Sequence, residues 1–323
     1  MGAEENAAPN GNSSVKDFVV ANFSISNRNA FWRIGSLLPA VLMLIVLTIY
    51  PVFNLIGLSF SEVEWIDGKS QSDFIGLANY EQLFKHETVY WIGVRNTIVF
   101  AICAVTVQML LGFSMALATQ KASGITRAML TGVFLLPIVM PPIVIGAMWR
   151  LLMGREFGPI NEIIKIFGFG PIDFLGNADI ALTSVIIVDI WHWTPFVFLL
   201  MLTGLESLDQ EVIEASRCDV KSPWQEIRYI TIPLMLPTIL ITLVLRLVLS
   251  FKVFDEIFLL TEGGPGTATE VINFSIYRTF FAQDRVGVGS AMSLLTLVAV
   301  AILIVVVNLW LQKRRAKIKE AIS

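Results

Sequence analysis

The feature that most constrains this chain is a series of six long apolar segments. Each is at least 18 residues long, which is enough for a helix to cross the hydrocarbon core of a bilayer. Only 15% of the residues are charged, against about 25% in soluble domains. The sequence therefore predicts an all-α integral membrane protein with six transmembrane helices. The expected spans are Ile34–Phe60, Trp91–Ala118, Met129–Leu152, Ile180–Leu205, Ile232–Leu249 (which can continue to Leu260) and Val288–Leu311.

The basic residues predict the orientation of these spans. Six spans place both termini on one side of the membrane. If that side is the cytoplasm, 13 Lys and Arg residues fall in cytoplasmic segments and 6 in external loops. Lys and Arg concentrate on the cytoplasmic side of membrane proteins. We therefore expect both ends in the cytoplasm of a multi-pass protein of the inner (plasma) membrane. The domain boundaries follow as a disordered polar tail (1–30), the six-span domain (31–312) and a basic tail (313–323).

Motifs for catalysis, metals and cofactors are missing. The tetrapeptide DGKS (67–70) has Val63 where a phosphate-binding loop requires glycine, so ATP hydrolysis is not expected in this chain. The histidines, His86 and His192, are not part of an HExxH motif and have no cysteine nearby in the sequence, so no metal site is expected. Two cysteines without a CxxC spacing favour neither a redox site nor a disulfide framework. We expect no enzyme activity and no cofactor.

A polar loop separates the fourth and fifth spans and reads EASRCDVKSPWQEIRYITIPLMLP (214–237). An apolar stripe before and within it, at Leu205, Leu208, Val212 and Ala215, predicts a short helix. A second helix is predicted to begin at Ser222, because Pro223 suits the first helical position and Gln225 completes a capping box. Such helices either dock into a groove of another protein or lie on the membrane surface, and the physical pattern leaves both open.

The loop resembles the EAA loop of binding-protein-dependent ABC transporter permeases. The matching residues are Glu214-Ala215-Ser216, then Asp219-Val220-Lys221, then the stretch ending at Pro233. Two further segments, TEGGPGTATEV (261–271) and FIGLANYEQLF (74–84), are similar to sugar-type permeases such as those for maltose and glycerol 3-phosphate. The resemblance covers about residue 31 to the C-terminus and points to carbohydrate import.

The resemblance also implies partners. A permease of this kind pairs with a second homologous permease subunit, two ATPase subunits that supply the energy, and a periplasmic or surface solute-binding protein. It implies ATPase coupling for Glu214, Ala215, Ser216, Asp219, Val220 and Pro233. One departure bears on this role, since Val220 replaces the glycine that forms the family's bend, and a β-branched residue is costly at positive φ.

Polar residues within the spans are candidates for the solute path, because ionisable groups are costly in a membrane. Sugars present hydroxyls to polar groups and apolar faces to aromatic rings, which favours the fourth span. The alternative is that the charged residues pair with each other and hold the helices together. The candidates are Asp189, Trp191, His192, Trp193, Arg246, Lys252, Ser290 and Ser293.

Two further expectations complete the interpretation. The segment 262–266 carries three glycines and a proline, so it is predicted to form a rigid external turn that ends the fifth span.

The leading function is a carbohydrate permease subunit of an ABC importer. The alternatives are an importer of glycerol 3-phosphate, a polyol or another small solute, or an ion-coupled secondary transporter, which predicts inverted repeats.

Overall fold

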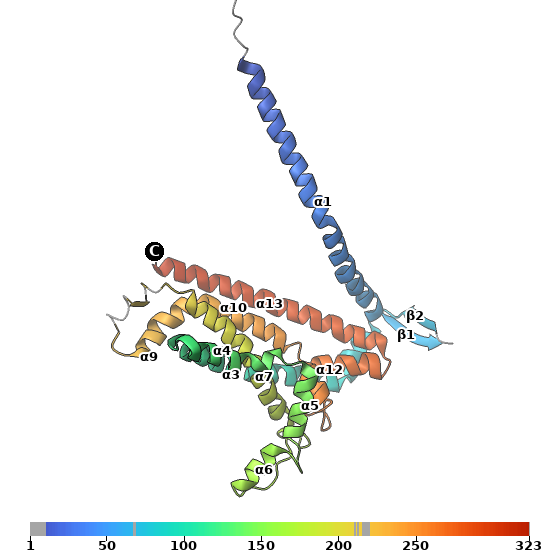
Figure 1. The fold of residues 1–323 in the computed structure, drawn as a ribbon. Helices are drawn as coiled ribbons and strands as arrows, with labels where there is room; N and C mark the ends of the chain where they lie inside the picture. Colours follow the sequence, from blue (N-terminus) through green and yellow to red (C-terminus); the bar gives the residue numbers. More distant parts are fainter. Residues whose placement is uncertain (1–10, 67–68, 210, 212, 215–219, 323) are drawn as a thin grey trace, which may run out of the picture. The chain divides into compact units, whose positions relative to one another are not determined.

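We describe the protein from a computed structural model. The description covers residues 11–66, 69–209, 211, 213–214 and 220–322. The chain divides into two compact units, 1–57 and 58–323, and each is described by itself. Figure 1 gives the order of the helices and strands along the chain.

The first unit consists of helix α1 (Gly11–Ser59), which runs on past the unit boundary. Its segment from Gly35 to Ser59 is apolar and long enough to cross a bilayer. The helix includes residues 11–30, which we expected to be disordered. A helix adds residues far more easily than it nucleates, and no proline precedes Pro39 after residue 11, so the apolar helix can extend backwards into the polar segment.

The second unit opens with a feature that the sequence analysis missed, an antiparallel hairpin of β1 (Ser61–Ile66) and β2 (Lys69–Phe74). Helix α2 (Ala78–His86) follows. Its buried Asn79 donates from Nδ2 to the carbonyl oxygens of Ser59 and Ser61, at 3.0 and 2.9 Å. This amide fixes the start of the hairpin on α2. A phosphate-binding loop would place Lys69 at the start of a helix. In this structure Lys69 is the first residue of strand β2.

The centre of the unit is a pair of long helices, α3 (Thr88–Lys121) and α7 (Ala181–Glu206), which pack along each other. Their contact is close at Gly112, where a Cβ atom would lie 2.7 Å from Cγ1 of Val197. Small residues allow membrane helices to approach in this way. Helix α4 (Gly124–Val139) packs against α7 as well.

The third expected span is not a straight helix. It consists of α4 and α5 (Pro142–Leu152), which are bent by 95° relative to each other. Pro141 lies between them in an extended conformation, and Pro142 starts the second helix. Proline disfavours helical geometry in the residue before it, which explains the break. Five helical stretches of the described chain can cross a membrane by length and composition, or six if the bent pair counts as one span.

The fifth span is formed by α9 (Pro223–Glu226), the π-helical turn η1 (Ile227–Thr231) and α10 (Ile232–Ser250). It does not continue to Leu260. Asn273 donates from Nδ2 to the carbonyl oxygens of Phe251 and Val253, at 3.2 and 3.4 Å. These bonds hold the chain in a turn before the separate helix α11 (Asp255–Leu260).

The rest of the unit is helical. A short helix α6 (Pro159–Ile166) follows α5. After α11 the chain turns through 261–271 into α12 (Ile272–Tyr277), the π-helical turn η2 (Arg278–Ala282) and the long helix α13 (Val286–Ile322). Figure 1 shows α9 and the end of α13 at one end of this unit, and α12 with the hairpin at the other. We call these the α9 end and the α12 end.

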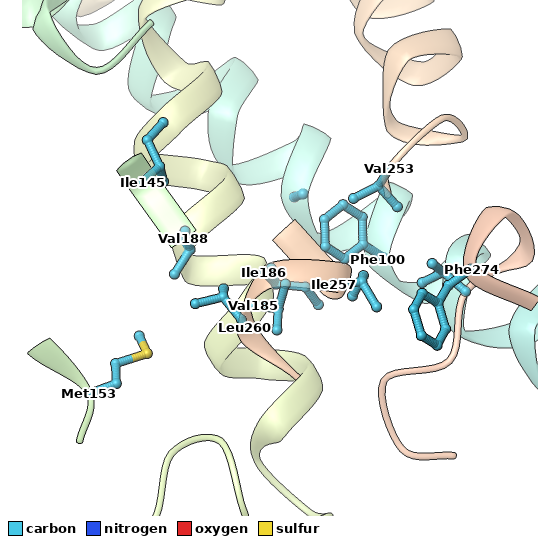
Figure 2. Close-up of a cluster of buried hydrophobic side chains, with 12 residues drawn as sticks. Phe100, Ile145, Met153, Val185, Ile186, Val188, Val253, Ile257, Leu260 and Phe274 are labelled. Atoms are coloured by element: carbon cyan, nitrogen blue, oxygen red, sulfur yellow. The ribbon is translucent and has the colours of Figure 1, made fainter. Parts of the chain in front are cut away.

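The main apolar core lies where α3, α5, α7 and α11 meet. Figure 2 shows Val185 and Val188 of α7 close to Ile257 and Leu260 of α11, with Phe100 and Phe274 beside them. This core fixes α11 against α7, and so determines which polar side chains of the two helices meet.

Candidate solute pocket and coupling loop

A buried charge cluster joins three helices in the interior of the second unit. Arg246 of α10 donates from Nη2 to Oδ2 of Asp189 at 2.6 Å and from Nε to Oε1 of Gln108 at 2.7 Å. Gln108 of α3 donates in turn from Nε2 to Oδ2 of Asp189 at 2.8 Å. None of the three is more than 2% exposed. Each group therefore has a partner in a place where an unpaired charge would be very costly.

Residues on the same turns of α7 border this cluster. The guanidinium of Arg246 lies over the ring of Trp193, 4.9 Å from its centroid, so the cation also has a π contact. One residue earlier, Nδ1 of His192 lies 3.0 Å from Oε1 of Glu256 on α11. His192 and Glu256 are both buried. The turn between α10 and α11 thus brings a second polar pair beside the first.

These groups line a small polar pocket of about 140 Å3. Its wall includes hydrogen-bond donors, acceptors and aromatic surface, the combination by which ligand sites orient a polar molecule. Arg246 and Asp189 compensate each other, which leaves Lys252, Asp255 and Glu256 as the other charged groups. The pocket is lined by Pro142, Asp189, His192, Trp193, Arg246, Leu249, Lys252, Val253, Phe254, Asp255 and Glu256.

Five of the eight expected solute-path residues meet in this pocket, namely Asp189, His192, Trp193, Arg246 and Lys252. The other three lie elsewhere. Trp191 packs against the apolar core with its ring 5.6 Å from that of Trp149. Ser290 is fully buried, and Ser293 donates back to the carbonyl oxygen of Gly289 at 2.8 Å. Neither serine lines the pocket.

Two polar residues that bond the charged groups of the pocket were not among those candidates. Gln108 bonds both members of the Arg246–Asp189 pair, and Glu256 pairs with His192. A polar side chain in an apolar span is a signal for Gln108. Glu256 follows the fifth span, so only the position of α11 reveals its role.

The polar loop lies at the α9 end. Ser222 caps α9 as expected, since its side chain accepts a hydrogen bond from the backbone N–H of Gln225. In a capping box the side chain of Gln225 would accept from the backbone N–H of Ser222. Here its Oε1 accepts instead from the backbone N–H of Lys221, one residue earlier, at 2.9 Å. The described part of the preceding helix includes Glu214, whose side chain is exposed.

The structure describes only some of the proposed coupling residues. Val220 is half-buried and Pro233, near the start of α10, is exposed. Ala215, Ser216 and Asp219 lie outside the described residues, as does Val212 of the expected apolar stripe. Glu214 is thus the one acidic coupling residue whose exposure is known.

A cleft of about 440 Å3 lies beneath this loop. Its walls come from the ends of α3 and α7, the start of α4, and α9 with η1. Arg127 of α4 forms an ion pair with Glu206 at the end of α7, and Gln120 donates to the carbonyl oxygen of Leu205 at 3.4 Å. The loop therefore lies against the ends of α3, α4 and α7, and of these helices α7 also lines the polar pocket.

At the opposite end, the segment 261–271 contains the predicted turn, but this turn follows α11 and does not end the fifth span, which stops at Ser250. Glu262 and Gly263 both have positive φ, and no helix continues through this segment. The fully buried Glu270 anchors the turn: its Oε1 accepts from Oγ of Ser275 at 2.7 Å and lies 3.1 Å from Nη2 of Arg278. Asn96 of α3 donates to the backbone oxygen of Glu270 at 2.9 Å.

An apolar helix bundle with a buried polar pocket is an architecture suited to a membrane transport protein. Residues 108–317 match the family of binding-protein-dependent transport system inner membrane components. The chain belongs to this family and is a permease subunit of a binding-protein-dependent importer. The protein is therefore a subunit of an importer and not an ion-coupled secondary transporter.

Relatives and solved structures agree with this assignment. The chain is 34% identical to the trehalose/maltose transport system permease protein MalF of Thermococcus litoralis, over 82% of this chain and 88% of the relative. It is 28% identical to the probable starch degradation products permease protein AmyD of Thermoanaerobacterium thermosulfurigenes, over 90% and 97%. The fold matches a subunit of a bacterial alginate ABC importer with a TM-score of 0.79 at 20% identity, over 89% and 98%.

Proposed function

We propose that the solute of this permease is a neutral carbohydrate that passes through the polar pocket between α7, α10 and α11. The single observation that carries the proposal is the pocket itself. It combines carboxylates, an imidazole and an ammonium group with the ring of Trp193, so both hydroxyls and apolar sugar faces find a partner. The names of the trehalose/maltose and starch-product relatives support the same solute class.

The charges of the pocket favour a neutral solute over glycerol 3-phosphate. Gln108 and Asp189 already accept hydrogen bonds from Nε and Nη2 of Arg246. Lys252 is then the other cation of the pocket, and Asp255 and Glu256 line it as well. A phosphate would lie close to these carboxylates without a free guanidinium to bind it bidentately. A polyol shares the hydroxyl chemistry of a sugar and remains the alternative solute.

The polar loop at the α9 end is proposed as the joint with an ATPase. Glu214 is exposed on it, and the loop lies at the end of α7, which also lines the pocket. In this proposal Glu214, Ala215, Ser216, Asp219, Val220 and Pro233 contact one of two ATPase subunits. A second homologous permease completes the channel, and an external solute-binding protein delivers the solute. Both termini then lie in the cytoplasm, as the distribution of basic residues predicts.

Uptake by the reconstituted importer tests the solute class. Proteoliposomes holding the whole complex and its binding protein are offered glucose, maltose, trehalose, glycerol and glycerol 3-phosphate. We expect ATP-dependent uptake of at least one neutral sugar and none of glycerol 3-phosphate. Uptake of glycerol 3-phosphate alone would exclude the proposal, and uptake of glycerol alone would favour the polyol.

Variants test the pocket in the same assay. His192→Ala removes a pocket side chain and should slow uptake about tenfold or more. A tenfold slower rate corresponds to an increase of about 1.4 kcal/mol in the activation free energy of transport. Ile187→Ala, an exposed position on the same helix, is the matched control and should transport normally. Wild-type uptake by His192→Ala in a fully assembled complex would remove His192 from the solute path.

A further inference from the structure

Four aromatic rings form a continuous row at the α12 end. Phe254 and Phe258 are nearly parallel, with centroids 5.4 Å apart. Tyr277 lies edge-on to both, at 5.3 and 5.6 Å. Phe281 follows at 5.7 Å from Tyr277. We call Phe254, Phe258, Tyr277 and Phe281 the aromatic row. Phe254 and Phe258 lie just before and within α11, and Tyr277 and Phe281 lie in α12 and η2. The row therefore connects two parts of the chain that the glycine-rich turn separates.

The row is the outer edge of a packed cluster and not its centre. Phe281 is 70% exposed and Phe258 38% exposed. Their neighbours face inward: Phe274 is buried in the core (Figure 2), and Phe280 packs against α13, where a Cβ on Gly289 would lie 2.8 Å from that of Phe280. Phe254 and Tyr277 of the row also pack against the core, whereas Phe281 and Phe258 leave ring surface exposed. The exposed rings therefore call for another explanation.

The row also ends in the polar pocket. Phe254 lines that pocket together with Asp255 and Glu256, and it contacts Phe258 and Tyr277 of the row. The half-buried Tyr277 donates its hydroxyl to no partner among the described residues. A row of contacting rings, with one hydroxyl that has no partner among the described residues, thus runs from an exposed ring at the α12 end to the proposed solute pocket.

We infer that the aromatic row is a carbohydrate-binding lane, which receives the sugar at Phe281 and conducts it to the pocket. This inference rests on the proposed function. Aromatic faces carry partial negative charge and attract the weakly positive C–H faces of a sugar ring. The Tyr277 hydroxyl adds a hydrogen-bonding group beside them. Because successive rings are less than 6 Å apart, the sugar can reach the next ring before it leaves the last.

The competing explanation for the exposed rings is contact with lipid. Leucine separates the two, because it covers apolar surface as phenylalanine does but lacks a π face. If the rings only face lipid, Phe281→Leu should behave as wild type. If they bind sugar, Phe281→Leu should slow uptake, and Phe281→Tyr, which keeps the ring, should restore it.

The test is uptake of glucose, maltose and trehalose by proteoliposomes that contain the complete importer. We expect Phe281→Leu and Phe258→Leu to lower the uptake rate about three- to tenfold each, the range for losing one aromatic contact. Tyr277→Phe should have a smaller effect, from the hydroxyl alone. The affinity of the binding protein for sugar should not change. Phe84→Leu, an exposed ring of α2 outside the row, is the matched control.

Each result has a defined meaning. Slow uptake in the leucine variants, with normal uptake in Phe281→Tyr and Phe84→Leu and equal yields of assembled complex, supports the lane. Wild-type uptake in both leucine variants overturns it and leaves the proposed function standing. Uptake of none of the three sugars by the wild type overturns the proposed function and the lane together.

Discussion

Arg246 of α10 and Asp189 of α7 form an ion pair of 2.6 Å in the interior of the bundle. Gln108 of α3 bonds both of them, so three helices that are far apart in the sequence meet at one buried polar point. Such a point gives little net stability over apolar packing, but it is costly to leave half-made. It therefore fixes the relative positions of the helices that form the pocket.

The first prediction concerns this pair. Arg246→Met leaves the carboxylate of Asp189 buried without its cation, and the folded state should lose about 3–5 kcal/mol. The double variant Asp189→Leu/Arg246→Met removes both charges and should recover most of this loss. The measurement is the melting temperature of the purified complex in detergent. Equal melting temperatures for Arg246→Met and wild type would show that the pair carries no such constraint.

The second prediction concerns coupling at Glu214. A local contact on a helix surface is worth only about 0.2–0.5 kcal/mol, whereas losing one partner of a buried interface charge pair costs about 2–5 kcal/mol. We expect Glu214→Lys to assemble but to lose most sugar-stimulated ATP hydrolysis. Glu211→Lys is the control, because Glu211 is an exposed residue of the same helical segment. Wild-type stimulation in Glu214→Lys would place the glutamate outside the ATPase joint, as expected for a helix on the membrane surface.

The third prediction is a pH dependence centred on Glu270. Burial raises the pKa of this carboxyl above its usual value, against the bonds from Ser275 and Arg278. A raised pKa in the folded state means that the folded protein holds the proton more tightly. Its contribution to stability is then complete below the ordinary pKa of glutamate, about 4.3, and is lost as the pH rises through the raised value.

Glu270→Gln should remove this pH dependence. The amide oxygen can still accept from Ser275 and Arg278, and no charge is buried at neutral pH. We expect the melting temperature of the variant to vary less between pH 4 and 8 than that of the wild type. Glu262→Gln, on the exposed side of the same turn, is the control and should follow the wild type. An unchanged slope in Glu270→Gln would assign the pH dependence to other groups.

The fourth prediction concerns topology. A cysteine in place of Ser323, in a Cys103→Ser/Cys218→Ser background, should not react with a membrane-impermeant maleimide in intact cells. A cysteine in place of Glu262, in the proposed external turn, should react. We expect the opposite pattern in inside-out vesicles. Labelling of Ser323→Cys from outside intact cells would contradict a cytoplasmic C-terminus.

Local sequence signals determined much of the fold. Apolar length predicted the long helices, and these include α3, α7 and α13. Ser222 and Pro223 predicted the start of α9, and the glycines around Pro265 predicted the turn after α11. Each of these features depends on interactions between residues that are neighbours in the chain, so the local sequence is enough to predict it.

The bend at Pro141 and the hairpin at residues 61–74 lay at the limit of such signals. The prolines at 141 and 142 were visible, but a long apolar segment with a proline can either kink or break. The hairpin consists mostly of polar residues, and the amide of Asn79 ties its first residue to α2. Tertiary contacts decide between outcomes that are locally similar in energy.

The polar pocket was beyond the sequence by itself. Asp189, His192 and Arg246 could be recognised as costly residues within spans, and both pairing and solute contact were open to them. Only the packing of α3, α7, α10 and α11 brought Gln108 to the Arg246–Asp189 pair and Glu256 to His192. The same packing turned Trp191 towards Trp149 and the core. A sequence lists which groups are costly to bury, but their partners follow from which helix faces meet in space.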